Sequence, residues 1–593
     1  MFIFVSFIFY YLLFYSFVIT FYFIHVLLIF IYFHFILYIN NKMKYINYFW
    51  NFVSSKNIDN IFGISGSAVS DILSKKPDSI NWINVGNELQ NGFIASVYGY
   101  YTKNVGLLFT TIGPGIATAL SAYKNAEAEH QPLIVISTFN PLVKEDFQWW
   151  NIKQIGDTIG NLIYIENNDE FITKLHKAYN LALKNTSVIL IININILRQT
   201  VKVSNSKSLN NSLDIGYINK INNNIVSRFN KKRILVVVGK GSFIDYSIAK
   251  QFILNNELPY VTTWKQRFII ENSLYCGRLG SLGHHSANYA VIKANRILII
   301  GNISEELNTP FFANKFSFIK LNKKSIVYLI SNKKKSLENK NVDTYFITDN
   351  VNDILSTLKI SCSKKWKNII TTSNNKLFNP IQPISKLERY IYAASQVYKN
   401  NSLEIPVTSG VGNHWYALGK YMDISKPESF ESTTSWSSIG TGLTNGIGIH
   451  YATKEHVWIF EGDGGFLFSS CAFLYLLENP NLPLTITLIV DAMYSAVVQT
   501  YVTKKFTNNE SNAVPYTKWT SILPNYVTFS NEIDYYNYLN ENPTSNNVRY
   551  IILMIDNSNL NESLVYDIHL DESYVKNAKN NNFQYMINKP LIL

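Results

Sequence analysis

The feature that most constrains the fold is an alternation of short β-branched runs with helix-length segments, which recurs along the whole chain after residue 42. In the first part these strand-like runs lie at 60–63, 106–111, 133–137 and 187–192. Strands separated by segments long enough for a helix form parallel sheets with crossover helices. We therefore predict an α/β fold built from doubly wound parallel sheets.

Two polar stretches, 203–212 and 371–376, are predicted to be linkers because Ser, Thr, Asn and Lys dominate them. A chain of 593 residues is too long for a single core. The predicted units are 43–205, 213–365 and 377–570, followed by a C-terminal tail at 571–593. Further predicted strands are 234–238, 296–300 and 318–321 in the second unit, and 457–460, 484–490 and 550–555 in the third.

The first 42 residues differ sharply in composition from the rest, because residues 1–41 contain no Asp, Glu, Lys or Arg. Two interpretations stay open. The segment exceeds the roughly 20 apolar residues of a membrane span, and as a genuine anchor it would leave a cytoplasmic body, because lysines follow it. Alternatively, the start is mis-assigned and the working protein begins at Met43, which opens an amphipathic helix typical of soluble, cytoplasmic α/β domains.

Charge and cysteine content exclude several classes of function. Lys and Arg exceed Asp and Glu by 53 − 41 = 12, but the longest basic run is only 333–335, with no basic helix or zinc module beside it. Nucleic-acid binding is therefore not expected. Cys276, Cys362 and Cys471 are too widely spaced for a metal cluster or a disulfide framework, which favours a reducing compartment.

A glycine-rich turn in the third unit is the strongest candidate for a binding site. Gly462-Asp463-Gly464-Gly465 lies between a predicted strand and a predicted helix, at the strand end where open α/β sheets bind ligands. Glycines let backbone amides approach a phosphate. Asp463, with Asp491 at the end of the next strand, can supply oxygens to Mg²⁺. Either residue alone is more often an ordinary turn residue, but the pair predicts a metal–diphosphate site.

A second candidate is Glu88, a lone carboxylate where a predicted strand leads into a helix of small residues. Gly86, Gly92 and Gly99 around it indicate close packing, so we expect Glu88 to be partly buried rather than a free surface residue.

Taken together, these motifs resemble those of thiamine-diphosphate-dependent enzymes of the acetolactate synthase and pyruvate decarboxylase type, and most of all the acetolactate synthase large subunit. The family motif is Gly-Asp-Gly, twenty-some residues, then Asn-Asn, and this chain has Val490-Asp491 in place of the asparagines. The resemblance implies pyrimidine-binding, central Rossmann-like and diphosphate-binding domains. It also implies thiamine diphosphate and Mg²⁺ as cofactors, with Asp463, Asp491 and the Met493 carbonyl as metal ligands.

Two more segments extend the resemblance. Residues 409–414 resemble a cofactor-contacting Asp-Val-Gly-Gln-His segment, and residues 436–440 resemble the decarboxylases' Trp-Gly-Ser-Ile-Gly. The residues implied to contact the cofactor are Gly412, Asn413, His414, Ser437, Ser438, Ile439, Gly462, Asp463, Gly464, Gly465 and Met493. In the family, the aliphatic residue at Ile439 bends the cofactor, whereas on sequence alone an Ile there would be a core residue.

The implied activity is decarboxylation of a 2-oxo acid, followed by carboligation to a second one. Glu88 is the implied catalytic residue, since the family's glutamate hydrogen-bonds the pyrimidine ring and thereby activates the cofactor. Simple decarboxylation is the alternative, and a catalytically inactive scaffold is a further one. Pyruvate decarboxylases carry a His-His pair that 138–152 lacks, and a glutamate where Val497 stands.

The synthase-like features are 277–283, which resembles the synthases' Gly-x-Leu-Gly-Met-His-Gly, and Phe147-Gln148. Residues 497–499 match the synthases' Val-Val-Gln, but Thr500 replaces the tryptophan that shapes the acceptor pocket. The family also implies a homodimer or homotetramer. FAD is a second cofactor of some members, but the pattern after Gly301 argues against tight FAD binding here.

Overall fold

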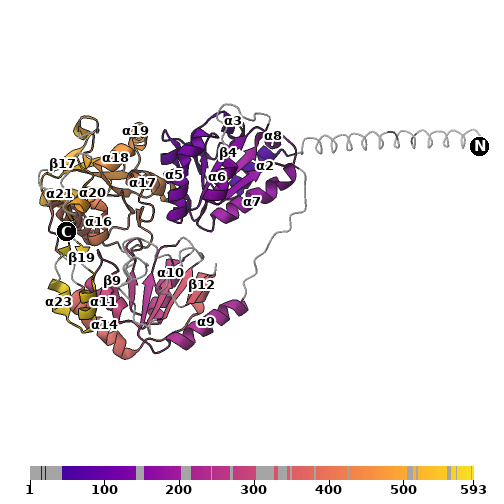
Figure 1. Cartoon of the computed structure of the whole chain (residues 1–593). Coiled ribbons are helices and arrows are strands. Elements are labelled where there is room, and N and C mark those ends of the chain that lie inside the picture. Colours follow the sequence, from indigo (N-terminus) through magenta and orange to yellow (C-terminus); the bar gives the residue numbers. More distant parts are fainter. Residues whose placement is uncertain are drawn as a thin grey trace, which may run out of the picture.

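A computed structural model gives the fold, which contains three separate parallel sheets, one in each predicted unit (Figure 1). Apart from Tyr15 and Phe21, the structure describes residues 43–141, 152–201, 215–241, 244–267, 272–301, 326–331, 344–347, 350–378, 382–424, 426–503, 512–515, 518–556, 562–565, 567–568, 570–588 and 591–592. Among these residues, no helix combines the length and the apolar content that a bilayer crossing requires. The predicted 1–42 anchor, the 203–212 linker, the 318–321 strand and the Phe147-Gln148 pair lie outside the described residues.

The first and third sheets have the same strand order. The first runs β2 (Asn81–Ile83), β1 (Asn60–Gly63), β3 (Gly106–Phe109), β4 (Leu133–Phe139), β6 (Ser187–Asn193), β5 (Leu162–Ile165). The third runs β14 (Phe430–Ser432), β13 (Val407–Ser409), β15 (Val457–Gly462), β16 (Leu484–Val490), β18 (Arg549–Met554), β17 (Val527–Phe529). All neighbouring strands in both sheets are parallel.

The central sheet has a different order, and it confirms the predicted Rossmann-like unit. It runs β12 (Thr344–Ile347), β11 (Ile326–Ser331), β10 (Arg296–Ile300), β7 (Ile234–Val238), β8 (Tyr260–Thr262), β9 (Tyr275–Arg278). Numbered from its own first strand, this is the doubly wound order 6-5-4-1-2-3. The strands predicted at 234–238 and 296–300 are confirmed.

Helices cover the sheets in all three units (Figure 1). In the first unit they are α2 (Tyr45–Ser55), α3 (Ser67–Leu73), α4 (Glu88–Tyr101), α5 (Pro114–Ala128), α6 (Ile152–Ile159), α7 (Phe171–Ala182) and α8 (Ile194–Leu197). The central unit has α9 (Ile215–Phe229), α10 (Tyr246–Asn255), α11 (His285–Lys293) and α13 (Val351–Thr357). The third has α15 (Lys386–Asn400), α16 (Asn413–Tyr421), α17 (Thr441–Thr453), α18 (Asp463–Phe468), α19 (Ser470–Glu478), α20 (Ser495–Thr503) and α21 (Glu532–Glu541).

The predicted linker at 371–376 is wrong, because these residues belong to helix α14 (Lys364–Leu377). The buried side chains of α14, Trp366, Ile370 and Leu377 among them, share one face that packs into the core of the central unit. The Thr, Ser and Asn residues that suggested a linker mostly occupy the other faces of this amphipathic helix. The predicted tail also contributes, since α22 (Glu572–Lys579) and α23 (Phe583–Asn588) pack on the same core.

The first and third units share a hydrophobic core, which α4 and α17 join. Ile94 and Val97 of α4 and Leu443 and Ile447 of α17 belong to one buried cluster. The two helices approach so closely that a Cβ atom on Gly448 would lie 2.7 Å from the Ile94 carbonyl oxygen. Only glycine fits there, and the contact holds the glycine turn of the third unit near the start of α4.

Candidate cofactor site

The glycine turn lies where β15 passes directly into α18. Asp463 is the first residue of α18, and its buried carboxylate accepts hydrogen bonds from two backbone amides. The Gly464 amide donates to Oδ1 at 2.8 Å, and the Ala492 amide donates to Oδ2 at 2.7 Å. Because Ala492 follows the neighbouring strand β16, Asp463 fastens together the ends of two parallel strands. This is the strand-end position that the sequence predicts.

Asp491 lies beside Asp463, at the end of β16, and it is also buried. Its Oδ1 accepts from the Met493 amide at 3.2 Å, and the Ser495 hydroxyl donates to Oδ2. Burial and then the charge of Asp491 raise the pKa of Asp463 to about 7, and burial raises the pKa of Asp491. Two adjacent buried carboxylates whose charges repel each other fit a cation between them.

The described residues hold no group of three His, Cys, Asp or Glu side chains that could bind a metal by themselves. A hard cation at Asp463 and Asp491 would therefore need further oxygens. The Met493 carbonyl, two residues beyond Asp491, is one such oxygen, and ligand phosphates are the usual source of others for Mg²⁺. The donor set fits a cation that arrives with a diphosphate.

Close contacts explain why glycines form the turn. A Cβ atom on Gly464 would lie 2.5 Å from the Tyr494 ring, and one on Gly465 would lie 2.1 Å from Glu461 Oε1. Gly462 faces His414, whose Cε1 would lie 3.2 Å from an added Cβ. Side chains therefore enclose the turn on several sides, which explains why these positions are glycines.

Asn413 and His414 begin α16 at the end of the neighbouring strand β13, and both are buried. Within the described part of the chain, His414 Nε2 and Asn413 Oδ1 make no hydrogen bond. Burial lowers the pKa of His414 to about 3, so its ring is neutral. Buried polar atoms without partners are costly and rare in native proteins. His414 lies against Gly462, where a polar ligand such as a diphosphate would complete its hydrogen bonds. The alternative, a histidine whose hydrogen bonds are all satisfied within the protein, does not match the unbonded Nε2 atom.

Glu461 is a site residue that the sequence analysis missed. Its side chain is fully buried directly before Gly462, and burial raises its pKa to about 8. Oε2 accepts from the Leu443 amide at 3.2 Å, which ties the turn to the first residues of α17. Oε1 makes no hydrogen bond to the residues described. The available signal was its place in a strand that is otherwise apolar, immediately before the Gly-Asp-Gly motif.

The loop 434–440, between β14 and α17, lies against the glycine turn. A Cβ atom on Gly440 would lie 3.1 Å from the Gly465 carbonyl oxygen. Ser437 and Gly440 both have positive φ angles, 58° and 74°. Ile439 is 38% exposed and Trp436 is 49% exposed, so Ile439 is not the core residue that its apolar character alone suggests. The loop instead presents apolar side chains beside the turn.

Glu88 begins α4 and is partly buried, as expected. The Thr110 hydroxyl lies 3.5 Å from its Oε1. Two residues later, the Gln90 side chain donates to the Phe468 carbonyl at 3.0 Å and accepts from the Ala472 amide at 2.7 Å. These bonds dock the start of α4 on the segment that joins α18 to α19, so Glu88 lies next to the helices that follow the glycine turn.

The structure thus gathers residues 412–414, 462–465, 491 and 493 at the ends of β13, β15 and β16, with the loop 434–440 packed beside them. Gln90 docks the start of α4, where Glu88 lies, on Phe468 and Ala472, which follow the glycine turn. The His284-His285 pair of the central unit lies elsewhere. The His284 ring stacks on Phe378, and His285 is hydrogen-bonded to Tyr574 at 2.9 Å. Both histidines serve the packing of the central unit.

At the end of β7 in the central sheet, the polar groups of the turn are bonded to one another and to the third unit. The Gly241 amide donates to the Tyr246 hydroxyl at 3.0 Å, and that hydroxyl donates to the Gly239 carbonyl at 3.1 Å. Lys240 between them is buried in an ion pair with Glu431 of the third unit. The Gly241 amide and the Lys240 ammonium group, which a pyrophosphate would otherwise contact at this strand end, therefore already have partners in the protein.

Comparison with known proteins gives two family matches. Residues 43–156 match the thiamine pyrophosphate enzyme N-terminal TPP binding domain, and residues 410–536 match the C-terminal TPP binding domain. Oxalyl-CoA decarboxylase of Escherichia coli K12 is 22% identical over 466 residues, 74% of this chain and 80% of that protein. The acetolactate synthase large subunit of Buchnera aphidicola is 24% identical over 69% of this chain and 75% of its own length. The 2-hydroxyacyl-CoA lyase of Saccharomyces cerevisiae is 25% identical over 43% of this chain and 47% of its own.

Proposed function

We propose that this chain, which belongs to the thiamine-diphosphate-dependent enzyme family of acetolactate synthase type, binds thiamine diphosphate with Mg²⁺, decarboxylates a 2-oxo acid and joins the product to a second 2-oxo acid. The observation that carries this proposal is the meeting of Asp463 and Asp491 with unpartnered buried atoms of Asn413 and His414 at one sheet edge. That combination suits a metal-bound diphosphate.

The chain's own residues divide the work of binding. Asp463, Asp491 and the Met493 carbonyl would hold the metal, and the Gly465 amide with His414 would contact the diphosphate. The Gly464 amide is bonded to the Asp463 carboxylate and would orient that ligand. Thiamine diphosphate, when bound, supplies a nucleophilic carbon for the 2-oxo group and accepts the electron pair left by CO₂. Ile439 would support the cofactor's bent shape through its exposed apolar side chain.

Glu88 is the proposed catalytic residue. Its carboxyl would hydrogen-bond a ring nitrogen of the cofactor and hold a proton there, which raises the basicity of the neighbouring amino group. This is general acid–base catalysis by a positioned carboxyl, and partial burial of Glu88 supports it because a half-buried side chain is held in a defined position.

We favour carboligation over simple decarboxylation because of Val497. Its apolar side chain, 44% exposed, stands where pyruvate decarboxylases are expected to carry a glutamate. An apolar side chain at this place cannot supply the proton that simple decarboxylation would need, so a second carbonyl compound is the proposed acceptor. Two relatives are named for acyl-CoA chemistry, which makes an acyl-CoA the second candidate substrate class.

We also propose a homodimer or homotetramer. Large apolar side chains are exposed around the loop 434–440 and on the following helices, namely Trp436, Ile439, Phe468, Leu474 and Val497. Exposed apolar groups that cluster near a site commonly mark an interface.

Calorimetric titration of the full chain with thiamine diphosphate, with and without Mg²⁺, tests the cofactor. Mass analysis of the products from a panel of 2-oxo acids and oxalyl-CoA then tests the reaction. We expect Mg²⁺-dependent binding, CO₂ release and an acetohydroxy acid. Absence of any binding would refute the enzyme proposal in favour of an inactive scaffold, and an aldehyde product would establish the simple decarboxylase.

A further inference from the structure

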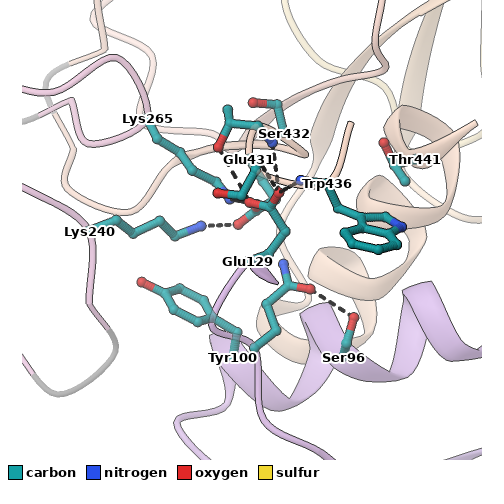
Figure 2. A network of polar contacts seen from close by, with 12 residues as sticks. Ser96, Tyr100, Glu129, Lys240, Lys265, Glu431, Ser432, Trp436 and Thr441 are labelled. Atoms are coloured by element: carbon teal, nitrogen blue, oxygen red, sulfur yellow. Dashed lines mark hydrogen bonds and ion pairs between the residues drawn. The ribbon is translucent and has the colours of Figure 1, made fainter. Parts of the chain in front are cut away.

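Glu129, the residue that follows α5 of the first unit, inserts its carboxylate into the third unit (Figure 2). Its Oε1 accepts hydrogen bonds from three consecutive backbone amides, those of Thr434, Ser435 and Trp436, at 2.8, 2.6 and 3.2 Å. The side chain is only 1% exposed. One buried carboxylate from the first unit therefore holds the beginning of the loop 434–440.

The central unit balances the charge of this carboxylate. Lys265 Nζ lies 2.6 Å from Glu129 Oε2 and 3.1 Å from an oxygen of Glu431, and Lys240 pairs with the same Glu431 (Figure 2). All four side chains are almost fully buried. The two carboxylates and two ammonium groups sum to zero charge, and each ion has an opposite partner. We call these four residues, which come from all three units, the junction cluster.

Burial alone would raise the pKa of Glu431, but Lys240 and Lys265 outweigh it and hold that pKa below the usual glutamate range. Lys240 also lies over the Tyr100 ring, 4.3 Å from its centroid, and the Tyr100 hydroxyl donates to Glu428 at 2.9 Å. The junction cluster is thus enclosed by further contacts between the first, central and third units. Such a network is fully partnered, which is the condition for buried ions to rigidify a structure.

The loop held by Glu129 is the one that carries Ile439. Beyond the three anchored amides, the backbone takes positive φ angles at Ser437 and Gly440, and Gly440 then packs on the glycine turn. Ser437 is not glycine, so its conformation carries strain that the surroundings must offset. Charge-assisted bonds to three amides immediately before Ser437 are placed to do so.

We propose that Glu129 is a positioning residue that, together with Lys265, fixes the loop 434–440 and thereby sets the affinity of the site for thiamine diphosphate. The inference rests on the proposed function for its cofactor, and the fixing of the loop can be measured without the cofactor. This proposal gives the central unit a role at the site, because Lys265 of that unit supplies the positive charge that allows Glu129 to be buried.

Two variants of the full chain separate positioning from simple stability. Glu129→Ala removes the acceptor of the three amides. The double variant Glu129→Gln with Lys265→Met keeps an acceptor oxygen and leaves Glu431 and Lys240 as a neutral pair. Hydrogen exchange of the amides at 434–436, without cofactor, reports on the loop, and calorimetry with thiamine diphosphate and Mg²⁺ reports on the site.

We expect Glu129→Ala to raise the exchange rate at 434–436 and the Kd for thiamine diphosphate by about 10-fold or more each, as loss of charge-assisted bonds implies. The double variant should stay within about 3-fold of the parent in the exchange rate and in the Kd, because the amides at 434–436 keep an acceptor.

Two control variants are matched to these changes. Glu127→Ala changes a half-exposed residue of the same helix, paired with Lys124 at 2.6 Å, and Glu388→Gln weakens an equally buried pair with Lys420 at 2.7 Å.

The controls should change neither the exchange at 434–436 nor the Kd, although Glu388→Gln should lower the unfolding temperature. A folded Glu129→Ala protein with parental exchange at 434–436, or with faster exchange but an unchanged Kd, would overturn the inference. So would a double variant as impaired as Glu129→Ala. If the parent protein binds no thiamine diphosphate, the proposed function and the affinity effect both fail, and the exchange data alone then decide whether Glu129 fixes the loop.

Discussion

Asp463 and Asp491 stand at the ends of adjacent parallel strands, and the Asp463 carboxylate is bonded to the amide of Ala492, the residue directly after Asp491, at 2.7 Å. This bond holds two buried carboxylates side by side, and the charge of one raises the proton affinity of the other. A cation between the two carboxylates would relieve this repulsion.

The first prediction concerns the two carboxylates. Asp463→Asn should weaken Mg²⁺-dependent binding of thiamine diphosphate by about 10- to 100-fold, since both Asp463 oxygens accept hydrogen bonds from backbone amides and the NH2 group of Asn would replace one of these acceptors. Asp491→Asn should change it by less than about 5-fold, because the amide oxygen can still ligate and the repulsion of the diphosphate falls. Calorimetry with and without Mg²⁺ checks both, and equal losses would contradict the assigned difference.

The second prediction concerns pH. Burial is the largest cause that lowers the pKa of four histidines, to about 3 for His284 and His414 and to about 4 for His285 and His456. In the unfolded chain these residues take up protons near pH 6.5, so the unfolded state binds more protons in acid. The stability that the neutral rings contribute is therefore complete above about pH 6.5 and is lost as the pH falls towards about 4.

Thermal unfolding followed between pH 7.5 and 5 measures this loss. Each histidine contributes a slope of at most about 1.4 kcal/mol per pH unit. His456→Gln should reduce the slope of stability against pH by the contribution of one histidine. An unchanged slope would show that His456 does not stay neutral in the folded protein.

The third prediction tests the proposed catalytic residue. Glu88→Gln should leave the Kd for thiamine diphosphate within a few-fold of the parent, because Glu88 supplies no metal ligand. Turnover should fall by about 10²–10⁴-fold, the usual contribution of a positioned acid–base group. NMR of deuterium uptake at the cofactor's reactive carbon should show the same loss, and parental turnover in this variant would exclude the role.

The fourth prediction separates site from core in the loop 434–440. Ile439 is 38% exposed, so Ile439→Ala should cost less than about 1 kcal/mol of stability while reducing turnover. The matched control is Ile447→Ala on α17, where the side chain is fully buried and truncation should cost about 2–5 kcal/mol. Chemical unfolding and steady-state rates check both variants. Equal destabilisation would make Ile439 a core residue after all.

Much of the fold follows from local sequence patterns. The β-branched run at 484–490 is a strand with those same bounds, because every residue in it is buried between helices. Very short strands such as Phe430–Ser432 carry no such pattern and were not predicted. The segment 371–376 was mistaken for a linker, because its polar residues hide the few buried positions that make α14 amphipathic.

The site divides in the same way. Some parts of the site consist of residues that are close together in the sequence: glycines that allow close contacts, and carboxylates at strand ends. These parts are the turn at 462–465, the start of the helix at Glu88 and residues 412–414. Such motifs are visible in a sequence because all their parts lie within a few residues. Glu461 is marked in the sequence only by its place directly before the Gly-Asp-Gly motif, and its burial at 0% exposure identifies it as part of the site.

Local sequence patterns are sufficient to predict three α/β units, the strand-end turn and the family that these motifs resemble. The tertiary structure decided what surrounds them. Glu129, Lys265 and Glu431 are separated by more than a hundred residues each, yet they meet as buried ions beneath the loop 434–440. No local pattern encodes that meeting, because it depends on how three separately folding sheets pack. Because each of these ions is buried, it needs an oppositely charged partner. This need exists only in the folded chain.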